Sequence, residues 1–155
     1  MTKIIAERSD GIEMRSFHGF ADVEAAKDLR PRQQSIWDLS GPGRGRRVAV
    51  GPNAIIVDVA PDVGVFVRYE SWDGPPDLYA EWETVWDGPL FLASGRVCAV
   101  QENQGEKDYC PAFDLGSEMT QWSARLLSKF VDNDREPLFP RDIYEVTLLT
   151  LQLWP

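Results

Sequence analysis

The sequence has few of the residues on which metal and redox chemistry depend. His18 is the only histidine, which excludes metal sites built on two or three histidines and the H-E-x-x-H motif. The two cysteines, Cys98 and Cys110, are separated by 11 residues and match no C-x-x-C spacing. Both lie in apolar surroundings, which is typical of buried thiols. We therefore expect two inert structural cysteines, no metal and no cofactor.

Long hydrophobic runs are also absent. The apolar stretch at 54–57 is far shorter than the roughly 20 residues that span a bilayer. Near the N-terminus, Glu7 and Asp10 interrupt any signal-peptide pattern. We expect a cytoplasmic protein with no membrane partner.

Basic residues are scarce. The chain has 16 Lys and Arg against 25 Asp and Glu, a formal net charge of −9, and a pI of about 4.6. Binding to phosphate backbones requires a basic stripe that releases counterions, so nucleic acid is a poor candidate partner. The acidity is segregated: residues 1–50 carry a net charge of +2, whereas residues 51–155 carry −11.

One segment combines acidic and aromatic residues. Between Glu70 and Asp87 lie six carboxylates and no base, interleaved with three tryptophans and a tyrosine. Aromatic side chains anchor protein interfaces, and carboxylates around them accelerate association with a basic partner. The simpler alternative is that Trp82 and Trp86 belong to the core and the carboxylates only maintain solubility. The candidate partner-binding residues are Trp72, Asp73, Asp77, Tyr79, Glu81, Glu83 and Asp87.

Period-two alternation predicts most of the chain from residue 54 onward as strands. Ala54 to Val59 and Val63 to Tyr69 are expected to form a hairpin through the connection at 60–62, and WDGPPD (72–77) is expected to be a loop. Leu78 to Trp86 follows as a strand that ends at Asp87-Gly88-Pro89. A second hairpin is expected for 90–93 and 96–100, closed by Ser94-Gly95, and the last strand for 143–154.

Three regions are less regular. Ser117 to Val131 fits both helical spacing and strand alternation, and we favour a helix behind a Ser117 N-cap. In the last strand the apolar face switches at Leu148/Leu149, which predicts either a β-bulge or burial on both faces. In the N-terminal third, 12–20 is a candidate strand, 22–29 a short helical turn, and 40–47 an exposed connector. Its arginines are suited to an acidic surface, either of the protein itself or of a partner.

Hairpin-spaced strands with Gly and Pro turns favour a sandwich over βαβ units. We expect a mainly β fold, an antiparallel β-sandwich of 7 to 9 strands with one or two short helices. Residues 1–155 are expected to form a single domain, in which 1–50 is a less regular N-terminal extension that packs on the sheet and adds an edge strand.

No motif indicates an enzyme. Neither the histidine nor the cysteines carry the signature of a nucleophile with its base. Glu81 and Glu83 share one strand face, so this pair cannot flank a glycosidic bond. The acidic turn at 132–136 resembles the start of a calcium loop, but Pro137 and Ile143 occupy the required glycine and glutamate positions.

From Val63 to Trp154 the chain contains VFVRY, YAEWETVWDGPLFLASGRVCAV, FDL and IYEVTLLTLQLWP. This order of elements, over about three fifths of the chain, resembles the competence protein J family of small nuclease inhibitors. The resemblance implies a non-enzymatic β protein that binds and blocks a nuclease or similar toxin. It carries over no binding residue, and the N-terminal 50 residues depart from it.

We therefore predict a non-enzymatic acidic protein-binding module, an inhibitor or immunity-type protein that blocks a basic partner such as a nuclease or toxin. It is expected to be a monomer or a weak homodimer. The alternative is a small-molecule or carbohydrate-binding β-sandwich protein, with weak enzymatic activity at most. Its cleft would be lined by aromatic residues, from Trp82, Trp86, Trp122 or Tyr109.

Overall fold

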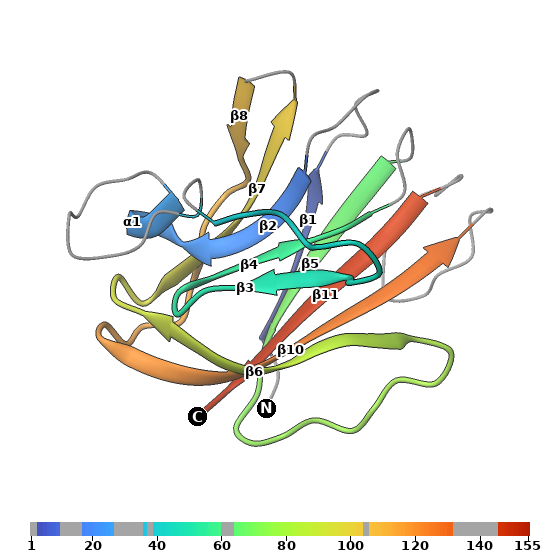
Figure 1. Cartoon of the computed structure of the whole chain (residues 1–155). Helices are drawn as coiled ribbons and strands as arrows, with labels where there is room; N and C mark the ends of the chain where they lie inside the picture. The colour runs from blue at the N-terminus through green and yellow to red at the C-terminus, as the bar shows by residue number, and fades with distance from the viewer. Residues whose placement is uncertain are drawn as a thin grey trace.

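A computed structural model describes residues 3–9, 17–26, 36, 39–59, 64–103, 106–131 and 146–155. These residues form two β-sheets that share one hydrophobic core (Figure 1). The mainly β sandwich expected from the sequence is therefore confirmed. The described residues include eleven strands, more than the 7 to 9 expected, and one short helix.

The first sheet has five strands. Their order is β1 (Lys3–Ser9), β5 (Gly64–Ser71), β11 (Val146–Trp154), β10 (Thr120–Val131) and β6 (Glu83–Leu92). Neighbouring strands are antiparallel except β5 and β11, which run parallel. The sheet thus departs from a purely antiparallel arrangement at its centre.

The second sheet lies across the core from the first. Its order is β3 (Val48–Val50), β4 (Ala54–Val57), β2 (Phe17–Asp22), β7 (Arg96–Asn103) and β8 (Glu106–Tyr109), and β9 (Phe113–Asp114) also pairs with β7. The helix α1 (Val23–Ala26) follows β2. It is the longest helix that the described residues contain, and none of them forms a helix able to cross a membrane.

Both predicted hairpins are wrong, for the same reason. The strands exist, but β4 belongs to the second sheet and β5 to the first, while β6 belongs to the first and β7 to the second. At both places the chain crosses between the layers. Alternation identifies a strand and its buried face, but it does not identify the partner strand. The connection at 60–62 lies outside the described residues.

The strand predicted at Leu78 to Trp86 is wrong in its bounds. β6 begins at Glu83 and continues through Asp87-Gly88-Pro89 to Leu92. A proline is tolerated there because β6 lies at the edge of its sheet, where a missing N–H interrupts no ladder. The pairing with β10 skips Val85, which forms a bulge. Residues 72–82 remain outside any strand.

The helix favoured for Ser117 to Val131 is also wrong. Thr120–Val131 is a strand paired on both sides, with β6 and β11. The alternating residues Trp122, Ala124 and Leu126 are buried, whereas Met119 and Phe130, which supported the helical spacing, are 64% and 57% exposed. Pairing on both edges and burial of the alternating face outweigh the local helical pattern.

The apolar switch in the last strand reflects burial on both faces. Leu149, Leu151 and Leu153 point into the core between the sheets, while Leu148 is buried on the opposite face. The register of β11 is continuous with both neighbours, so no bulge is present. Residues 143–145 of the predicted strand lie outside the described residues.

The N-terminal region contributes to both sheets. β1 forms an edge of the first sheet, as expected, but β2 lies inside the second sheet between β4 and β7. The helical turn is present as α1, and the Asp22 carboxylate caps it by accepting a hydrogen bond from the Glu24 N–H at 3.0 Å. Residues 12–16 and 27–29 lie outside the described part of the chain.

Tyr69 of β5 joins the two sheets at the centre of the core. Its ring stacks on Phe113 with centroids 5.4 Å apart and meets Phe20 edge-on at 6.1 Å. Its hydroxyl accepts a hydrogen bond from the backbone N–H of Ala99 at 2.7 Å. Ala99 lies in β7 between the stretches that pair with β8 and with β9, so the hydroxyl supplies the partner that neither strand provides.

Candidate functional site

The segment from Trp72 to Trp82, hereafter the acidic loop, packs against the outer face of the first sheet. It follows β5 and forms the yellow-green coil at the lower edge of Figure 1. Its start is held by a hydrogen bond from the Trp72 N–H to the Leu153 carbonyl at 2.9 Å. At its end, Trp82 packs on the buried Leu148. The loop thus covers a face of the sheet that would otherwise be exposed to solvent.

A fully buried carboxylate fixes the loop to the sheet. Glu70 has 0% exposure and accepts four hydrogen bonds. Two donors come from the sheet, Arg68 Nε and Gln152 Nε2, each at 2.9 Å. Two come from the loop, the indole N–H of Trp72 at 2.9 Å and the hydroxyl of Tyr79 at 2.7 Å. A buried charge is tolerated when it is paired and hydrogen-bonded in this way.

The same environment perturbs the ionisation of Tyr79. Burial, followed by the hydrogen bond to Glu70 and the negative charge of Glu70, raises the pKa of the Tyr79 hydroxyl well above its ordinary value of 10.0. The hydroxyl of Tyr79 is therefore neutral throughout the physiological pH range, and it is this neutral form that holds the loop.

Arg125 of β10 holds the loop at a second point. Its Nη1 donates to the Pro76 carbonyl at 2.9 Å, and its Nε forms an ion pair with Asp87 at 3.2 Å. Its guanidinium lies 5.3 Å from the centroid of the Trp154 ring. The middle of the loop is thereby tied to the strand that crosses beneath it.

The seven predicted partner-binding residues fall into two groups. Trp72 and Tyr79 are half-buried and turn toward Glu70, so their polar atoms serve the attachment of the loop. The other five are exposed carboxylates: Asp73, Asp77, Glu81, Glu83 and Asp87. The structure brings the residues of the loop together on one face of the first sheet, with their aromatic rings inward.

Three of these carboxylates are paired with bases from distant parts of the sequence. Glu83 meets Arg47 at 2.8 Å, Asp87 meets Arg125, and Glu81 lies 3.8 Å from Lys129. The segment contains no base of its own, so its charge in the sequence overstates its charge in the fold. The pair with Glu83 also shows that Arg47 of the connector docks on the protein's own acidic surface, one of the two options expected.

Sequence reasoning missed Leu78. Continued strand alternation would place its side chain on the same face as Trp82 and Trp86, yet it is 68% exposed in the acidic loop, directly after Asp77. The preceding Pro75-Pro76 is the signal that could have identified it, since two consecutive prolines do not enter a strand ladder.

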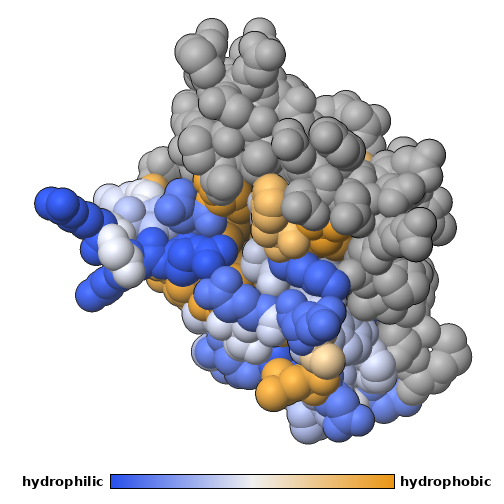
Figure 2. Space-filling model, turned by 90° about the vertical axis from the view of Figure 1, so that its right-hand side faces the viewer, coloured by the Kyte–Doolittle hydropathy of each residue, from blue (hydrophilic) through white to orange (hydrophobic). Residues whose placement is uncertain are grey.

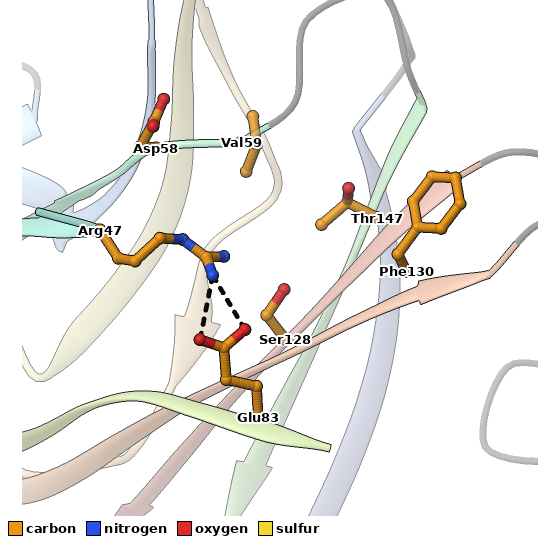
Figure 3. Close-up of a pocket in the computed structure, with 7 residues that line it drawn as sticks. All are labelled: Arg47, Asp58, Val59, Glu83, Ser128, Phe130 and Thr147. Carbon is orange, nitrogen blue, oxygen red and sulfur yellow. Dashed lines mark hydrogen bonds and ion pairs between the residues drawn. The ribbon is translucent and has the colours of Figure 1, made fainter. Parts of the chain in front are cut away.

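A cavity of about 400 Å³, hereafter the open-end cavity, lies where the two sheets separate. Figure 2 looks onto this end of the molecule, where hydrophobic residues show near the centre of the view and hydrophilic residues lie to their left and below them. Its lining residues, drawn in Figure 3, are Arg47, Asp58, Val59, Glu83, Ser128, Phe130 and Thr147.

The four aromatic residues named for the alternative cleft do not all lie in one place. Trp82 packs on the outer face of the first sheet, whereas Trp86 and Trp122 pack against the core between the sheets. Tyr109 lines a second cavity, of about 300 Å³, together with Cys98 and Cys110. Both cysteines are free, and among the described residues no cluster of His, Cys, Asp and Glu is suited to hold a metal.

No family model and no curated protein matches the sequence. Two solved structures are similar to the chain, each with a TM-score of 0.45 over 99% of this chain and 95% of the other. One is ComJ from Bacillus subtilis, an inhibitor of the DNA-degrading activity of NucA, at 10% identity. The other is the crocagin biosynthetic gene J protein, at 15% identity. ComJ bears the name of the family that the sequence resembles.

Proposed function

We propose that this chain is a non-enzymatic protein-binding module, an inhibitor or immunity-type protein that blocks a basic partner such as a nuclease or toxin. The acidic loop is the proposed contact surface. The observation that carries the proposal is the buried Glu70, which fixes an exposed acidic segment in one conformation.

The attachment of the loop favours binding because it reduces the entropy lost on association. Two hydrogen bonds from the loop to Glu70 and the bond from Arg125 to the Pro76 carbonyl hold the loop before any partner arrives. A preformed binding segment does not have to be ordered in the complex, so more of the contact energy appears as affinity.

The charge on the loop favours a basic partner. Asp77 is exposed and makes no ion pair within the described part of the chain. Glu81 pairs with Lys129 at 3.8 Å while its side chain remains 83% exposed, and such a pair contributes little and exchanges readily for a partner's base. Carboxylates at the rim of an interface mainly raise the association rate.

Leu78 supplies an exposed apolar side chain in the same loop as these carboxylates. Interfaces place apolar anchors inside a polar rim, and the exposed Leu78 between Asp77 and Glu81 follows that arrangement. Trp72, considered an anchor from the sequence, contributes indirectly by holding the loop through Glu70.

The test is affinity capture from the native host with three forms of the chain as bait. These are the wild type, the loop variant Asp77→Asn with Leu78→Ser, and a control variant, Glu118→Gln with Met119→Ser. The control makes the same kinds of change in the turn before β10, where Met119 is 64% exposed. Capture is compared at low salt and at about 1 M salt, where the screening length falls to about 3 Å.

We expect the wild type and the control to retain one basic protein in stoichiometric amount at low salt, and the loop variant to lose it. Binding kinetics of the isolated pair should then show that Asp77→Asn lowers the association rate and Leu78→Ser raises the dissociation rate. Equal capture by the loop variant and the control would exclude the acidic loop as the contact surface. Failure of every bait to retain a basic protein would refute the function itself.

A further inference from the structure

The open-end cavity is built where the inner faces of β10 and β11 change from apolar to polar. Along β11 the inner row runs Leu153, Leu151, Leu149 and then Thr147. Along β10 it passes from Leu126 to Ser128. The core therefore ends in two hydroxyl groups instead of two further aliphatic side chains, and these hydroxyls line the cavity.

These two hydroxyls have no structural use that the described residues reveal. Ser128 and Thr147 are each only 6% exposed, yet neither hydroxyl forms a hydrogen bond with another described residue. Neither oxygen is among the fully buried side-chain atoms that lack a hydrogen-bond partner, so both hydroxyls are open to the cavity. Polar groups of this kind, facing a cavity, are typical of a ligand site.

The remaining lining residues restrict the class of ligand. Arg47 is neutralised by Glu83, to which its Nη1 donates at 2.8 and 3.0 Å, and Asp58 adds a second carboxylate. Arg47 and Phe130 lie on opposite sides of the two hydroxyls (Figure 3). Among the described lining residues there are two carboxylates and one guanidinium, a balance that disfavours anions.

We propose that the open-end cavity binds a neutral saccharide of one or two sugar units. The hydroxyls of Ser128 and Thr147 exchange hydrogen bonds with sugar hydroxyls, and the planar groups of Arg47 and Glu83 offer further donors and acceptors. The Phe130 ring, 57% exposed, packs on the C–H face of the sugar ring. A cavity of about 400 Å³ is within the range of small-ligand sites, about 300–1,000 Å³.

The site is separate from the acidic loop, although Glu83 begins the strand that follows it. The saccharide site is therefore independent of the proposed protein partner. A chain that binds a saccharide but no protein partner would support the saccharide site alone, and a chain that binds a protein partner but no saccharide would support the protein-binding function alone.

The experiment uses the full chain, ¹⁵N-labelled, and a panel of neutral mono- and disaccharides with glucuronate and glucosamine as charged counterparts. Chemical-shift changes are followed by NMR for the wild type and for Ser128→Ala with Thr147→Val. The control is Ser123→Ala, on the same strand. We expect at least one neutral sugar to shift the amides of Ser128 and Thr147 saturably. The double variant should bind this sugar more weakly, by up to about tenfold for each hydroxyl removed. The control variant should bind it as tightly as the wild type.

The same variants test the hydroxyls without any ligand. Because neither hydroxyl stabilises the fold, the double variant should melt at or above the wild-type temperature. A clearly lower melting temperature would show that the hydroxyls are structural and would overturn the proposal. So would a panel in which no neutral sugar shifts these amides, or in which only a charged sugar does.

Discussion

At the scale of single residues, Glu70 determines more than its own position. A carboxylate with 0% exposure requires donors, and half of its donors come from a loop that has no strand pairing. Removal of one donor leaves a buried carboxylate oxygen short of a hydrogen bond, which costs more than the hydrogen bond contributes. The conformation of the acidic loop is thus coupled to one side chain of β5.

The raised pKa of Tyr79 predicts a loss of stability at high pH. Above about pH 10 the unfolded chain releases the Tyr79 proton while the folded chain keeps it, because the folded pKa lies higher. The free energy of unfolding therefore declines as the pH rises past 10 toward the folded pKa. Urea unfolding of the wild type and Tyr79→Phe between pH 8 and pH 11 measures this effect.

We expect Tyr79→Phe to cost about 1–3 kcal/mol below pH 9, since the hydroxyl donates to a charged acceptor, and to cost progressively less above pH 10. Tyr109→Phe, which changes a 40% exposed tyrosine outside the acidic loop, is the comparison for any general effect of the substitution and of high pH. A Tyr79→Phe difference that does not change with pH would contradict the assigned role.

For this segment the sequence predicted partner-binding residues, and the structure shows that two of them, Trp72 and Tyr79, attach the loop to Glu70. The sequence singled out Trp72 and Tyr79 because aromatic residues lie among carboxylates, but it took the carboxylates as surface groups. It could not predict that Glu70 is buried, because burial of a charge depends on donors such as Gln152, which is 82 positions away in the chain. Leu78 was missed because alternation was continued through a loop.

At the scale of elements, the crossings between layers depend on individual turn residues. Gly95, between β6 and β7, has a φ of +71°, and a Cβ there would lie 2.7 Å from the Ser117 carbonyl oxygen. The adjacent Ser94 is held by the buried Asp22 carboxylate, which accepts from its N–H and its hydroxyl at 2.8 Å each. This turn connects the end of β6 in the first sheet to the start of β7 in the second sheet.

Gly95→Ala should destabilise the protein by about 2–4 kcal/mol, through left-handed strain and the clash with Ser117. The matched control is Gly45→Ala, since Gly45 has a φ of +78° with no atom within 4 Å of the added Cβ. It should cost only about 1–2 kcal/mol, the strain alone. Thermal or urea denaturation measures both, and equal costs would argue against the clash.

The turn at Ser94-Gly95 was predicted from the sequence, but the crossing between sheets that it makes was not. Ser94-Gly95 suits a tight hairpin, and the same backbone conformation also serves a crossing between sheets. The partner of each strand depends on which buried faces fit together across the core, and that information is spread over the whole chain. The preference of 120–131 for a strand likewise comes from its two neighbours.

At the scale of the molecule, side chains join the two sheets across the core. The hydroxyl of Tyr69 is the hydrogen-bond partner of Ala99 across the core, and its ring stacks on Phe113. A buried N–H without a partner is costly, so this contact influences the stability of the whole sandwich.

Tyr69→Phe should therefore lower the free energy of unfolding by about 1–3 kcal/mol, because it leaves the Ala99 N–H unsatisfied. Thr150→Val provides the comparison. Thr150 is fully buried, and its hydroxyl has no hydrogen-bond partner among the described residues, so its loss should be neutral or stabilising. Urea unfolding of both variants tests this, and a neutral Tyr69→Phe would show that the hydroxyl does not join the sheets.

The fold class was accessible from the sequence because it depends on alternation, turn residues and composition, all of which are local. The order of strands was not. Val65, Val67 and Tyr69 were correctly placed on one face of a strand, but nothing in them indicates that β11 pairs with that strand in parallel.

The position of β11 also bears on how the chain folds. It lies between β5 and β10, and Val146 pairs with Gly64, so the centre of the first sheet is completed by a strand that is synthesised after all the other described strands. Such distant pairings slow folding. Until β11 inserts, the inner edges of β5 and β10 are open to pairing with other chains. The nascent protein thus has a window of aggregation risk, and the speed with which this strand inserts decides how long that window lasts.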